Sequence, residues 1–102
     1  MKITVSSPDI TRVHTHCLVI PIHKNDRWSA SARKVEAATQ GLISTLTKAG
    51  DIDGRPGTVL MTPAPSGINA QRLLLVGVGE HPDADDFARA AAATAQRHRH
   101  RD

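Results

Sequence analysis

One apolar segment, Leu73–Val78, constrains the fold more than any other part of this sequence. Successive side chains of a β-strand point to opposite faces of the sheet. Both faces of this strand would be apolar, since Leu73 and Leu75 alternate with Leu74 and Val76. Such a strand is typical of the centre of a sheet that helices cover on both sides. The sequence therefore predicts an α/β domain with this segment as the central strand.

Three further strands are predicted, over Lys2–Val5, Cys17–Ile22 and Thr58–Thr62. The first alternates polar and apolar residues and is short, which indicates an edge strand. The second is apolar apart from Pro21, which has no N–H to donate to a neighbouring strand. We therefore expect Pro21 at a sheet edge or near a strand end.

Two amphipathic helices are predicted, over Ser31–Ala49 and Asp83–Arg97. The first has an apolar stripe at helical spacing, formed by Val35, Ala38, Leu42, Leu46 and Ala49. Ser29 or Ser31 is expected to cap its start, and Gly50 suits the position after its end. The predicted order is β-β-α-β-β-α, with a mixed central sheet and helices on both of its faces.

The chain has 102 residues, one cysteine and a net charge of +3 at pH 7. This length suits one domain, and the lone Cys17 suits a reducing compartment. The apolar runs are too short to span a bilayer, so we expect a cytoplasmic protein that does not enter a membrane. The domain is expected over residues 1–96. Residues 97–102, RHRHRD, are expected to form a basic disordered tail.

Two local patterns in the sequence could form binding sites. His14 and His16 are two residues apart and would share one face of a strand, where they could chelate a transition metal. Cys17 would point the other way, so the alternative is two surface histidines before a strand. The segment Gly77-Val78-Gly79 lies between a strand and a helix, which invites comparison with phosphate-binding loops. A third glycine is missing and acidic residues follow, so a tight turn is the alternative.

The sequence also offers basic residues that could contact nucleic acid, namely Lys34, Lys48, Arg97, Arg99 and Arg101. On one continuous helix, Lys34 and Lys48 would lie about 40° apart and about 21 Å apart along the axis. Trp28 and Phe87 are the only aromatic residues, and neither is interleaved with these cations for base stacking. Solvated surface charge is the alternative. No residue is expected to be catalytic, to bind a cofactor or to bind a metal.

Residues 30–96 resemble the N-terminal domain of the leucyl (cytosol) aminopeptidase family. Members have a helix followed by a Gly-acid-hydrophobic-x-Gly-Lys/Arg-x-Gly turn, which reads GDIDGRPG over Gly50–Gly57 here. A short apolar strand follows, here Thr58–Met61, and later an Arg-hydrophobic strand that ends in Gly-hydrophobic-Gly, here Arg72–Gly79. An acidic turn and an Ala-rich helix complete the pattern, similar to Asp83–Ala95.

The resemblance implies a macro-domain-like α/β sandwich at the periphery of a hexamer, which contributes to DNA binding in some bacterial members. The family's catalytic domain removes N-terminal amino acids, often Leu, and holds two divalent metal ions of the Zn or Mn type. None of its catalytic motifs occurs in this chain. The implied partners are the protein's own C-terminal catalytic domain and like subunits.

Three functions are compatible with the sequence. The first is a non-catalytic domain that assembles or regulates a leucyl-aminopeptidase-like metallopeptidase. The second is a small nucleic-acid-binding module, and the third is a macro-like pocket for ADP-ribose after Leu73–Val78. The family's domain continues with further strands and a long helix. We therefore expect this chain to be a truncated domain whose open sheet edge favours a homo-oligomer.

Overall fold

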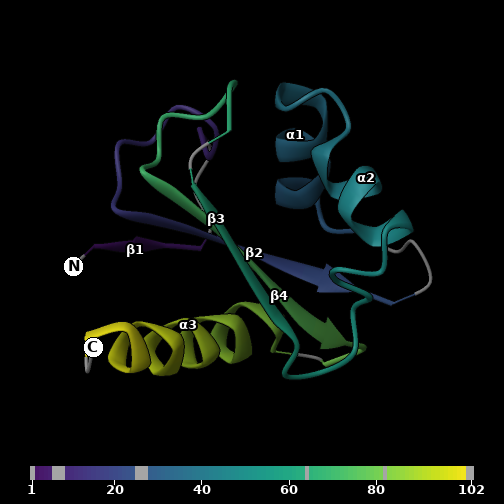
Figure 1. The fold of residues 1–102 in the computed structure, drawn as a ribbon, viewed down its shortest axis with the longest axis vertical. Helices are drawn as coiled ribbons and strands as arrows, with labels where there is room; N and C mark the ends of the chain where they lie inside the picture. Colours follow the sequence, from purple (N-terminus) through teal and green to yellow (C-terminus); the bar gives the residue numbers. More distant parts are fainter. Residues whose placement is uncertain (1, 6–8, 25–27, 64, 82, 101–102) are drawn as a thin grey trace.

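A computed structural model describes residues 2–5, 9–24, 28–63, 65–81 and 83–100, with side chains described as far as Ala95. Its four strands form one sheet in the order β1-β2-β4-β3 (Figure 1). These strands are β1 (Ile3–Thr4), β2 (Cys17–His23), β3 (Val59–Pro63) and β4 (Arg72–Gly79). All four predicted strands are confirmed, with ends that differ by at most one residue.

The strand β4 lies inside the sheet, as the apolar pattern predicts. It runs parallel to β2, with Val19 beside Leu74 and Ile20 beside Leu75. On its other side it pairs with β3 in the antiparallel sense, so the sheet is mixed. The strand β1 pairs in parallel with only Cys17 and Leu18 of β2. Pro21 therefore lies in the part of β2 that extends beyond β1. Its missing N–H breaks no hydrogen bond to β1, because β1 does not reach this position.

Two apolar clusters lie on opposite faces of this sheet. The first packs the sheet against α1 (Ala30–Ala38) and α2 (Leu42–Lys48), and its buried members include Leu18, Ile20, Leu73, Leu75, Val35 and Ile43. The second packs the sheet against α3 (Ala84–His100), and its buried members include Val19, Leu74, Val76, Val78, Ala88 and Ala92. Helices therefore cover both faces, as predicted (Figure 1).

The prediction of one continuous helix over Ser31–Ala49 is wrong. The chain leaves the α1 helix at Gln40, which has a left-handed φ of 58°, and Gly41 follows with a φ of 92°. The Gly41 N–H donates to the Glu36 carbonyl oxygen at 2.9 Å, and the Gln40 N–H donates to that of Ala37 at 3.4 Å. This bond pattern is the Schellman motif that ends helices.

The helix α2 then begins with a cap from the preceding helix. The Glu36 side chain accepts a hydrogen bond from the Ser44 N–H at 3.2 Å and contacts the Ser44 hydroxyl. The predicted apolar stripe continues from α1 into α2, and glutamine is not a residue type that usually marks a left-handed turn. The sequence pattern therefore hid the break. At the other end of α2, Gly50 follows the cap residue Ala49, as predicted.

The helix α3 contains most of the second predicted helix and continues to His100, beyond the predicted end at Arg97. Residues 97–100, which were expected in the tail, thus have helical backbone. Arg101 and Asp102 lie outside the described residues. The His81 ring lies 5.0 Å from that of Phe87, and the His81 Nδ1 accepts the Asp83 N–H at 3.1 Å. Both contacts hold the start of α3 close to the end of β4.

Candidate functional site

The carboxyl ends of parallel strands are the usual ligand position of an open α/β sheet. Here the parallel strands β2 and β4 end at His23 and Gly79. A loop, Gly54–Thr58, lies across both ends and is bonded to β4. The Gly77 N–H donates to the Thr58 carbonyl oxygen at 2.7 Å, and the Gly79 N–H donates to that of Gly54 at 2.8 Å. The chain thus fills part of this position with its own backbone.

The contact between this loop and β4 is closer than a side chain at position 77 would allow. A Cβ atom on Gly77 would overlap the Arg55 carbonyl oxygen and the Thr58 Oγ1, and would lie 2.9 Å from the Gly54 carbonyl carbon. Below 3.0 Å, the backbone itself would have to shift. Glycine at position 77 therefore permits the loop and the strand to interlock.

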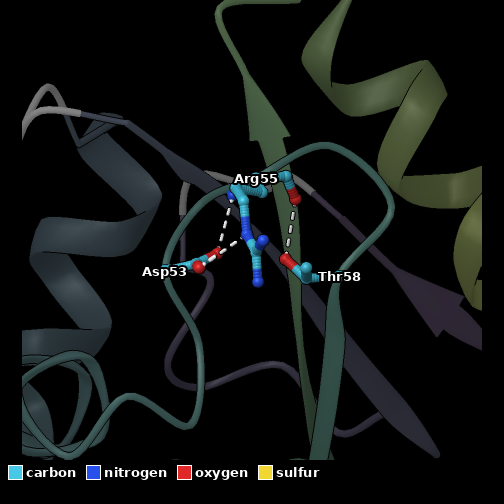
Figure 2. A network of polar contacts seen from close by, with 3 residues as sticks. All are labelled: Asp53, Arg55 and Thr58. Carbon is cyan, nitrogen blue, oxygen red and sulfur yellow. Dashed lines mark hydrogen bonds and ion pairs between the residues drawn. The ribbon is translucent and has the colours of Figure 1, made fainter.

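Polar contacts also hold the loop in its own shape (Figure 2). The Asp53 carboxylate accepts the Arg55 N–H at 3.0 Å and pairs with the Arg55 Nε at 2.7 Å. The Thr58 hydroxyl donates to the Arg55 carbonyl oxygen at 2.7 Å. A carboxylate that accepts the N–H two residues later forms an Asx-turn. The Asp53–Arg55 pair is exposed, so its expected contribution to stability is small.

These contacts make a pH-dependent prediction for Asp53. The Arg55 backbone N–H, and then the charge of its guanidinium, hold the pKa of Asp53 below its ordinary value. Because the pKa of Asp53 is lower in the folded state than in the unfolded state, ionisation of this carboxyl stabilises the folded state. This contribution is present above about pH 4 and is lost as pH falls through the folded-state value. In urea unfolding between pH 5 and pH 2, Asp53→Asn should therefore lose less stability on acidification than the wild type.

The exposed carboxylate of Asp51, in the same segment, provides the matched control. Asp51→Asn should follow the wild-type pH profile more closely than Asp53→Asn does. Equal profiles for the wild type and Asp53→Asn would contradict a role for the Asp53 carboxylate in holding the turn.

The geometry does not favour a phosphate site after β4. The N–H groups of Gly77 and Gly79 are already bonded to the loop. A hollow of about 390 Å³ lies beside the start of α3, and it is lined by His23, Ser29, Asp83, Ala84, Asp85 and Asp86. Three carboxylates at this position would repel a phosphate. The His81 N–H donates to the Val78 carbonyl oxygen at 2.9 Å, which closes a tight turn between the strand and the helix.

The two candidate histidines both lie before β2, which begins at Cys17, and both are exposed. The His16 Nδ1 accepts the Lys2 N–H at 2.8 Å. Within the described ranges, the structure contains no group of three histidine, cysteine, aspartate or glutamate side chains that could hold a metal ion.

The candidate basic residues are distributed over separate elements. Lys34 lies on α1 and Lys48 at the end of α2, and both are exposed. Because the helix breaks between them, the spacing expected from one continuous helix does not apply. Arg97 and Arg99 belong to α3, on the opposite face of the sheet, and their side chains lie outside the described set, as does residue Arg101. The described part of the chain therefore shows no basic surface shared by all of them.

The sequence pattern does not predict the contact between the two glycine-rich segments, residues 54–57 and 77–79. They are separated by the whole β3 hairpin, and each was interpreted as a turn in its own right. Two glycine-rich segments, one just before β3 and one at the end of β4, the next strand along the chain, are the signal that could have indicated a close backbone contact.

The chain is similar to a known family of protein domains. The family described as "Cytosol aminopeptidase family, N-terminal domain" matches residues 19–100, a range that contains most of β2 and every later element through α3.

No helix in the described ranges is both long and apolar enough to cross a membrane.

Several similar proteins are named "Probable cytosol aminopeptidase". The protein from Halorhodospira halophila is 36% identical over 95 residues, which cover 93% of this chain and 19% of the relative. Those from Burkholderia orbicola and Paraburkholderia xenovorans are 44% and 42% identical over 79 residues, or 78% of this chain and 16% of each relative. The chain thus spans at most about a fifth of the length of these relatives. With four-fifths of its length matching that domain, the chain belongs to the cytosol aminopeptidase family and corresponds to its N-terminal domain.

Proposed function

We propose that this chain is a non-catalytic domain that helps to assemble or regulate a leucyl-aminopeptidase-like metallopeptidase in the cytoplasm. The observation that carries the proposal is the Gly54–Thr58 loop, which is bonded across the strand end where an α/β sheet would hold a ligand. The segments that interlock there are the same ones that resemble the aminopeptidase domain. Their shared role is therefore structural.

In this proposal the chemistry belongs to a catalytic domain outside these 102 residues. That domain would release N-terminal amino acids, often Leu, with two divalent metal ions. The layout of a mixed sheet between helices agrees in outline with a macro-like sandwich. ADP-ribose is a weaker candidate ligand because carboxylates line the hollow beside α3. Nucleic acid is a weaker candidate partner because the described cations lie on separate elements.

The first test is hydrolysis of Leu-p-nitroanilide by the purified chain. No release of p-nitroaniline above the buffer rate is expected with Zn²⁺ or Mn²⁺ present, because the structure offers no cluster of metal ligands among its described residues. A full-length family member, run in parallel, checks that the assay works. Hydrolysis that depends on added metal and copurifies with the chain would contradict the proposed role.

We further propose that the isolated chain forms a homo-oligomer through β3. This strand has β4 on one side and no other described strand on the other side, and its Val59 side chain is 44% exposed. An edge strand of this kind can pair with a second copy. Light scattering should therefore show a dimer or a larger species. Val59→Lys should shift the mass towards the monomer, because a charged edge opposes strand pairing.

Ala90→Lys is the matched control for this experiment, since Ala90 is exposed on α3. That variant should keep the wild-type mass. A monodisperse wild-type monomer would contradict self-association. A monomer produced equally by both lysine variants would assign the effect to net charge and contradict pairing through β3.

A further inference from the structure

We draw no further inference here: the strongest candidate, the hollow that His23, Ser29 and the acidic start of α3 line beside the carboxyl ends of β2 and β4, carries nothing, because no group of three metal-ligating side chains forms within the described residues and nothing in the structure shows what would occupy it.

Discussion

Gly77→Ala is expected to lower the free energy of unfolding by about 3 kcal/mol, which combines overpacking with the weakening of hydrogen bonds. The added Cβ would overlap the Arg55 carbonyl oxygen and the Thr58 Oγ1. Relief requires the loop to move away from β4. That movement would weaken the bonds from the Gly77 N–H to Thr58 and from the Gly57 N–H to Gly77, which are 2.7 and 3.1 Å long.

Urea unfolding followed by circular dichroism would measure this loss. Gly57→Ala separates the close contact from backbone strain, because Gly57 has a φ of 85° but open space where its Cβ would lie. Its expected cost is about 1 kcal/mol, the strain of a side chain in the left-handed region. Gly77 is not among the glycines with positive φ, so its larger cost would come from contact alone. An unfolding midpoint for Gly77→Ala at or above that of Gly57→Ala would contradict the interlock.

The strands could be predicted from the sequence because alternating or continuous apolar residues indicate which faces of a strand are buried. Turn residues indicate where each strand ends. The central place of β4 followed from leucines on both of its faces, which no exposed edge strand would need. With Trp28 and Phe87 as its only aromatic residues, the chain has mainly aliphatic side chains with which to form a core. Among the described residues, the buried apolar core is aliphatic apart from Cys17, and Trp28 and Phe87 are only partly buried at its margins.

The break at Gln40 and the interlock at Gly77 could not be predicted in the same way. A helix break at glutamine depends on tertiary packing, which here buries Ile43 completely against the sheet. The hydrophobic stripe alone favoured Leu42 and Leu46 instead, and both are only partly buried. The interlock joins residues that are about twenty positions apart, so neither segment reveals its partner. Local patterns describe each element, whereas these two features depend on how separate elements meet.

The two apolar clusters on opposite faces of the sheet make a sharper prediction, because neighbouring residues of β4 belong to different clusters. Leu74 is 1% exposed in the cluster under α3, and Leu75 is 0% exposed in the cluster under α1 and α2. Leu74→Ala and Leu75→Ala should each lower the free energy of unfolding by about 3 kcal/mol, because each removes buried methyl groups and leaves a cavity. Urea unfolding of the two variants measures how much each apolar cluster contributes to stability, and the change of side chain is the same in both.

Val59→Ala is the control and should cost less than about 1 kcal/mol, because the Val59 side chain is 44% exposed and little buried surface is lost. If α3 packed only loosely on the sheet, the cost at Leu74 would approach that of the control while the cost at Leu75 stayed large. Equal, large losses of unfolding free energy at both leucines require both apolar clusters to exclude water in the isolated chain. Such a result would show that these residues fold as a packed unit of their own, which the proposed role in assembly or regulation requires.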